Sequence, residues 1–135
     1  MRLSVCIHRF FSEYITGMKG CSHSTVKAYR DTFRLLLPYT AQKYGIKPDS
    51  LRIEHLSIET VLSFLNHLEK DRGNSVRTRN HRLAAIKSLA VMIRFLYPEH
   101  RRLCDRIESL HRKRAHKPLV GYLTRRYRRC LTASI

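Results

Sequence analysis

A cluster of cations at the start of an expected helix is the part of this sequence best suited to chemistry. Gly73 and Asn74 have turn composition, and Ser75 is a good helix N-cap. Free backbone N–H groups and the helix dipole favour anions at a helix N-terminus, so cations there favour phosphate further. A solvated helix face is the competing interpretation of the same residues. The cluster holds the cations Arg77, Arg79 and Arg82, together with Asn80 and His81.

Cysteine and histidine are the other residues that could do chemistry. No two cysteines form a C-x-x-C pair, and the Cys-x-His steps at residues 6–8 and 21–23 have the wrong spacing for the usual zinc fingers. We therefore expect reduced thiols, some in the core, and no metal or cofactor. The four cysteines are Cys6, Cys21, Cys104 and Cys130.

The charge of the chain indicates a polyanionic partner. Its 135 residues suffice for one domain, and 43% of them are apolar, which favours folding over disorder. The net charge is +17, and residues 75–135 alone hold 16 basic and 3 acidic residues. Nucleic acid is the simplest partner for such a balance. An anionic membrane surface ranks lower because the basic helices lack a face rich in Trp and Phe. No signal peptide or spanning segment is evident, so the expected location is the cytoplasm.

The elements that must position these cations are all expected to be helices. Apolar residues recur every three or four positions, and turn residues separate the segments. We expect Pro38 to kink the second helix. The architecture is therefore all-α, with four helices in one bundle, a fifth helix and a basic tail. The expected helices span residues 3–17, 25–44, 58–72, 75–97 and 98–114.

Each helix has an expected buried stripe. The helix over residues 75–97 has the broadest one, behind its basic start, and a further polar line of Asn80, Lys87 and Arg94 at seven-residue spacing. The expected core positions are Val5, Phe10 or Phe11, Tyr14, Ile15, Val26, Tyr29, Phe33, Leu36, Leu37, Ile58, Val61, Leu62, Leu65, Leu68, Leu83, Ala85, Ile86, Leu89, Ala90, Met92, Ile93, Leu96, Tyr97, Leu103, Ile107 and Leu110.

Two stretches, STVKAYRDTFRLLL at Ser24–Leu37 and GNSVRTRNHRLAAIKSL at Gly73–Leu89, carry a family resemblance. Together with the helical order, they resemble the N-terminal core-binding domain of tyrosine recombinases, the SAM-like domain of phage integrases, and most closely the transposon-associated integrases. The segment Lys113–Thr124 resembles the linker to the catalytic domain of that family. By this resemblance, residues 3–97 form the core-binding domain, 98–115 an additional helix, and 116–135 a linker remnant and basic tail.

The resemblance implies a DNA-binding role. In that family the core-binding domain is one half of a C-shaped clamp, and two helices, matching Ser24–Tyr44 and Ser75–Tyr97, lie across the major groove. Most contacts are expected to reach phosphate, with Asn80 and Arg77 as the expected base readers. Tyr29 and Phe33 are expected in the core. The implied DNA contacts are Ser24, Thr25, Lys27, Arg30, Arg77, Thr78, Arg79, Asn80, Arg82 and Lys87.

The C-terminus departs from that family. The catalytic domain of the family follows the linker, whereas this sequence continues for 11 residues after Thr124 and reads RRYRRCLTASI. A frameshift or truncation is our hypothesis for this change. We expect no enzyme activity, because Tyr122 and Tyr127 lack the fixed cations that a phosphate-attacking tyrosine needs. The H-x-x-R step from His111 to Arg114 copies recombinase active-site spacing, and chance in an Arg-rich chain explains it better.

Three functions remain open at this point. The first is a DNA-binding core-binding module without its enzyme half. The second is a general basic nucleic-acid binder, which would prefer structured RNA. The third is an inactive remnant of a mobile-element integrase, which would unfold without cooperativity. The expected partner is double-stranded DNA, with an intact recombinase relative as a further candidate and no membrane or small-molecule ligand. A monomer is expected off DNA.

Overall fold

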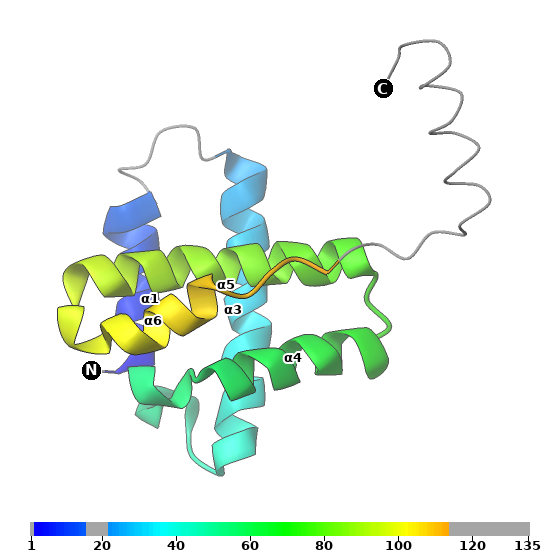
Figure 1. Cartoon of the computed structure of the whole chain (residues 1–135), viewed down its shortest axis with the longest axis horizontal. Helices are drawn as coiled ribbons and strands as arrows, with labels where there is room; N and C mark the ends of the chain where they lie inside the picture. The colour runs from blue at the N-terminus through cyan, green and yellow to red at the C-terminus, as the bar shows by residue number, and fades with distance from the viewer. Residues whose placement is uncertain (1, 16–21, 114–135) are drawn as a thin grey trace.

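The computed structural model describes residues 2–15 and 22–113, and within these ranges the chain is all-α, as expected (Figure 1). An isolated bridge between Arg2 and Arg52 is the one extended pairing in these ranges. The linker and tail expected over residues 116–135 lie outside them. The elements are α1 Leu3–Arg9, the π-helical turn η1 Phe10–Tyr14, α3 His23–Tyr44, the 3-10 turns η2 Pro48–Ser50 and η3 Ile53–His55, α4 Ile58–Lys70, α5 Val76–Leu96, the 3-10 turn η4 Pro98–His100, and α6 Arg101–Glu108.

Three of the helices begin with the same Ser-x-x-Thr cap. In each, the serine hydroxyl oxygen accepts a hydrogen bond from the threonine backbone N–H, which satisfies one of the free donors at a helix start. The sequence therefore sets where α3, α4 and α5 begin. The pairs are Ser22 with Thr25 at 3.1 Å, Ser57 with Thr60 at 3.2 Å, and Ser75 with Thr78 at 3.2 Å.

Helix α5 is the centre of the bundle. It crosses α3 and contacts η1, α4 and α6, and α6 runs beside it (Figure 1). The expected apolar stripe of α5 is buried, except that Leu96 is exposed and Tyr97 half-buried. Around it pack the buried residues Leu3, Cys6, Phe10, Phe33, Leu36, Leu51, Ile53, Leu56, Val61, Phe64, Leu65, Leu68, Cys104 and Ile107.

Three expected core positions are wrong: Leu96 on α5, Val5 and Leu62 are exposed. Val5 is 47% exposed and Leu62 is 39% exposed. On α4 the buried arc runs through Val61, Phe64, Leu65 and Leu68, and a residue one position after Val61 points about 100° away from it. Phe64, which the sequence analysis missed, occupies the core side of this arc.

The ends of the helices also differ from expectation. The first expected helix changes from α1 to a π-helical turn at Phe10, and the last one, expected over residues 98–114, starts with a 3-10 turn and ends at Glu108. The chain at residues 110–113 is not helical. Helix α3 runs through Pro38 as one element. Because tertiary contacts fix helix ends as much as local propensity does, these boundaries were the least predictable part of the fold.

Candidate nucleic-acid interface

The two helices expected to contact DNA are joined at their crossing. Arg82 on α5 donates from Nη1 to the backbone oxygen of Ala28 at 3.2 Å and to Oγ1 of Thr32 at 3.1 Å, both on α3. Farther along α5, Oγ of Ser88 donates to the hydroxyl of Tyr29 at 3.3 Å. These hydrogen bonds fix the mutual orientation of α3 and α5, and Figure 1 shows the two helices crossing at a steep angle.

Four of the expected contact residues have exposed side chains: Ser24, Lys27, Arg30 and Arg77. The guanidinium of Arg30 lies over the ring of Phe11, 5.4 Å from its centroid, which restrains this cation without neutralising it. Lys27 and Arg77 form no ion pair with any described residue. These three cations are therefore available to phosphate.

The two threonines that were expected to contact DNA are hydrogen-bonded within the helix caps. Thr25 and Thr78 are half-buried, and their hydroxyl oxygens lie 3.0 and 3.2 Å from the hydroxyls of Ser22 and Ser75. Their backbone N–H groups donate to the same serines. Both threonines therefore stabilise the starts of α3 and α5.

Arg79 makes an ion pair inside the fold. Its Nε lies 3.5 Å from Glu69 on α4, and the side chains of Arg79 and Glu69 are only 11% and 18% exposed. Arg79 also donates from Nη1 to Oδ1 of Asn80 at 3.2 Å. Its charge is thus partly balanced within the bundle. Arg82, by contrast, hydrogen-bonds to two neutral acceptors on α3, which hold its guanidinium in place.

Asn80, an expected base reader, contacts the backbone of the chain after α6. Its Nδ2 donates to the carbonyl oxygen of Lys113 at 2.7 Å, and its Oδ1 accepts from the backbone N–H of Lys113 at 2.8 Å. Lys87, seven residues along the same side of α5, is half-buried. At the far end of this line, Arg94 forms ion pairs with two residues of α6. Its Nη1 lies 3.2 Å from Oδ1 of Asp105, and its Nε lies 3.4 Å from Oε2 of Glu108. The seven-residue line therefore faces α6 and the segment that follows it.

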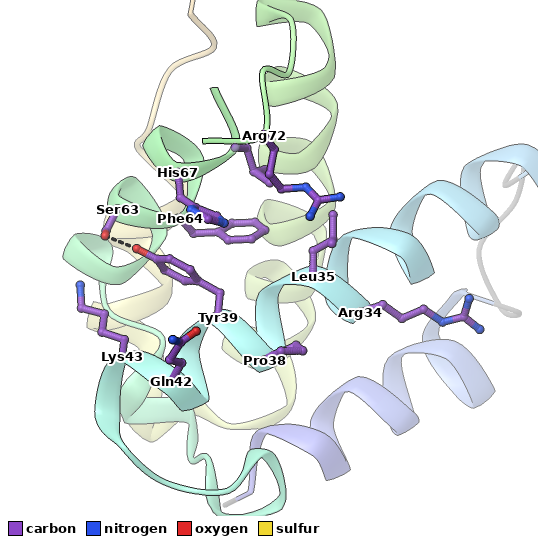
Figure 2. Close-up of a pocket in the computed structure, with 11 residues that line it drawn as sticks. Arg34, Leu35, Pro38, Tyr39, Gln42, Lys43, Ser63, Phe64, His67 and Arg72 are labelled. Atoms are coloured by element: carbon purple, nitrogen blue, oxygen red, sulfur yellow. Dashed lines mark hydrogen bonds between the residues drawn. The ribbon is translucent and has the colours of Figure 1, made fainter. Parts of the chain in front are cut away.

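A second cationic surface, missed by the sequence analysis, lies between α3 and α4 (Figure 2). It is a groove of about 620 Å³ with an apolar floor that includes Phe64 and Tyr39, and Tyr39 stacks on His67 at 5.0 Å. Arg34, Lys43 and Arg72 contribute its cations, and no acidic residue lines it. The signal for Arg34 was present, since it follows Lys27 by seven positions and lies on the same face of α3.

The described residues also bear on thiol reactivity and on metal binding. Burial, followed by the charges of Glu108 and Asp105, raises the pKa of Cys104 to about 11, and burial also raises the pKa of Cys6. Such thiols are poor nucleophiles at neutral pH. In residues 2–15 and 22–113 no three His, Cys, Asp or Glu side chains are placed to hold a metal ion. In the same ranges no helix is long and apolar enough to cross a membrane.

Comparison with known proteins identifies relatives over most of the chain. Residues 8–100 match the family described as phage integrase, N-terminal SAM-like domain. The chain is 35% identical over 123 residues to the protein named "Putative integrase/recombinase y4rC" of Sinorhizobium fredii, and 32% identical over 123 residues to "Putative integrase/recombinase y4rD" of the same organism. No solved structure shows significant similarity.

These alignments cover most of this chain but less than half of each relative. Each alignment includes 91% of this chain, but only 37% of y4rC and 44% of y4rD. The chain thus spans less than half the length of either relative. The family match itself runs from the last two residues of α1 to the end of η4, which includes both capped basic helices. The chain therefore belongs to the phage integrase family, through its N-terminal SAM-like domain.

Proposed function

We propose that this chain is a DNA-binding domain of the integrase/recombinase type, which holds duplex DNA against the N-terminal halves of α3 and α5. The observation that carries the proposal is the crossing of two capped helices, locked by Arg82, that present the exposed cations Lys27, Arg30 and Arg77. A fixed pair of basic helix starts suits the regular spacing of phosphates on a duplex.

The expected contact residues take two kinds of role in this proposal. Lys27, Arg30 and Arg77 contact phosphate, and Ser24 adds a hydroxyl at the exposed start of α3. Arg77 is the remaining candidate for reading a base, because Asn80 uses both ends of its amide on Lys113. The other residues, Thr25, Thr78, Arg79, Asn80, Arg82 and Lys87, act by shaping or supporting the surface.

A general polyanion binder is the second candidate function. The groove between α3 and α4 favours it, because its cations Arg34, Lys43 and Arg72 enlarge the basic surface beyond the two helix starts. A surface of this kind binds RNA and DNA by charge, with little dependence on helix geometry. The two candidates differ in preference for duplex DNA over structured RNA.

Fluorescence anisotropy of a labelled duplex, measured over a series of salt concentrations, tests the proposal. The logarithm of affinity should fall linearly with the logarithm of salt concentration, and Lys27→Ala and Arg77→Ala should each lower the slope by about 0.9, the value of one phosphate contact. Lys47→Ala is the matched control, because Lys47 is exposed but follows the far end of α3. Equal slopes for all variants, or stronger competition by an RNA hairpin than by duplex, would favour the general binder.

Catalysis is a separate question, and we propose that this chain does not cleave DNA by itself. The proposal rests on the family match, which is to the N-terminal SAM-like domain. Incubation with recombination-site DNA followed by denaturing electrophoresis would reveal a covalent protein–DNA adduct. The expected result is no adduct at Tyr122 or Tyr127, and an adduct would refute it.

A further inference from the structure

The groove between α3 and α4 is lined by the later parts of both helices (Figure 2). Its volume is about 620 Å³, and it extends from Arg34 to Lys43 on α3 and from Ser63 on α4 to Arg72 in the turn that follows α4. None of the described lining residues belongs to the first turn of a helix. The groove therefore lacks the free backbone N–H groups and the positive dipole end that favour phosphate at the starts of α3 and α5.

The floor of the groove offers aliphatic surface, and its aromatic rings pack against one another. The ring of Tyr39 stacks on His67 with 5.0 Å between the centroids and lies 5.5 Å from the ring of Phe64, which is fully buried. None of these rings is left as a platform on which a nucleobase could stack. Leu35 is half-buried and Pro38 is exposed. Apolar side chains of a polypeptide are the groups that best cover such aliphatic surface.

The cations of the groove are spread along its length. Arg34 and Lys43 are nine positions apart on α3, which separates their backbones by about 14 Å, and Arg72 is contributed from the α4 side. Lys43 and Arg72 form no ion pair with any described residue. Arg34 lies 3.9 Å from Asp31, and the two side chains are 72% and 42% exposed, so this contact neutralises Arg34 only weakly. Cations that do not converge on one point suit an elongated ligand with several negative charges better than a small anion.

We propose that this groove binds an acidic amphipathic helix of a partner protein. Apolar side chains of that helix cover Leu35 and Pro38, while its carboxylates pair with Arg34, Lys43 and Arg72. An amphipathic helix presents apolar side chains at positions i, i+3, i+4 and i+7, a span of about 10 Å that fits between the outer cations of the groove. Its negative charge complements a groove whose described lining holds three Lys or Arg residues and no acidic residue. A second copy of this chain is a poorer occupant, because two chains of net charge +17 repel each other.

Fluorescence anisotropy of a labelled peptide tests the proposal. The probe is a synthetic helix of about 18 residues with Leu along one face and Glu elsewhere, and two control peptides replace its Glu by Lys or its Leu by Ser. We expect only the first peptide to bind. Arg72→Ala and Lys43→Ala should each weaken its binding by about twofold to fivefold, Arg72→Glu by more, and Lys47→Ala, an exposed control, should have no effect. No binding of the Leu/Glu peptide, equal binding of the Ser control, or unchanged binding by Arg72→Glu would overturn the proposal.

Duplex competition separates this groove from the proposed DNA surface. Arg77→Ala should leave the affinity for the Leu/Glu peptide unchanged, and Arg72→Ala should leave the salt dependence of duplex affinity unchanged. The peptide should also stay bound when duplex is added. Displacement of the peptide by duplex, or a duplex slope that Arg72→Ala lowers by about 0.9, would overturn the proposal and assign the groove to nucleic acid. Failure of the unaltered chain to bind duplex would overturn the proposed function, while the peptide measurements would still decide what the groove binds.

Discussion

Replacing Arg82 by methionine separates the architecture of the proposed DNA surface from its contacts. Methionine keeps a long unbranched side chain but removes the guanidinium group. The variant loses the two hydrogen bonds from Nη1 to α3, at 3.2 Å to the oxygen of Ala28 and 3.1 Å to Oγ1 of Thr32. If Arg82 acts by joining α5 to α3, this change should lower stability. If it acts as a phosphate contact, the change should lower affinity instead.

The expected loss in the free energy of unfolding depends on the surroundings of the two acceptors. Hydrogen bonds that involve a charged group contribute about 1.5–3 kcal/mol each. Ala28 is exposed, so water can replace Arg82 at its carbonyl, whereas Thr32 is 1% exposed and already donates to Ala28 at 2.9 Å. Two such bonds would together contribute about 3–6 kcal/mol, and compensation at both acceptors lowers the expected loss to about 2 kcal/mol. For a chain of this size that is a drop of about 5–10 °C in Tm.

Thermal unfolding followed by circular dichroism measures this drop, and duplex anisotropy well below Tm measures affinity. Arg77→Met is the reciprocal variant, because Arg77 is exposed and unpaired among the described residues. It should change stability by less than about 0.5 kcal/mol and lower the salt slope by about 0.9. Loss of affinity without loss of stability in Arg82→Met would refute the assignment of Arg82 as a structural link.

Three further outcomes are expected from the described contacts. Ser75→Ala removes the hydroxyl that accepts from Thr78 and should cost about 1 kcal/mol in denaturant unfolding, with Ser50→Ala as an exposed control. Gly45→Ala should cost about 1–2 kcal/mol because Gly45 has a φ of 66°, while Gly45→Asn should cost less; equal costs would contradict this reason. The pKa of Cys104 is raised from 9.0 to about 11, so the folded state binds its proton more tightly than the unfolded state. The stability advantage of the native protein over Cys104→Ala should therefore be complete below about pH 9 and shrink by about 2 kcal/mol toward pH 11, and a pH-independent difference would contradict it.

The sequence predicted the helices that build the site. Ser75 was identified as a cap, and its hydroxyl oxygen accepts a hydrogen bond from the backbone N–H of Thr78. The apolar stripe of α5 is buried over Leu83–Ile93 as expected. These features depend on neighbours within one or two helical turns, so periodicity and capping chemistry are enough to find them.

The sequence predicted exposure less well. Leu62 was expected in the core because it is apolar, but the partner elements cover the neighbouring arc of α4. Likewise, the expected helix over residues 98–114 ends at Glu108, and Lys113 pairs with Asn80 instead. No local signal marks either outcome, because each depends on which surface another element covers.

The amino-acid sequence by itself determined that this chain forms capped helices, one of which begins with a cluster of cations and continues as the core of a bundle. It did not distinguish among the cations of that cluster, because Arg77, Arg79 and Arg82 have the same chemistry and nearly the same neighbours. The tertiary structure decided that Arg77 remains exposed, that Arg79 pairs with Glu69, and that Arg82 bonds to α3. The physical reason is that availability to a ligand depends on the partners that distant elements supply, and those partners are brought close only when the helices pack.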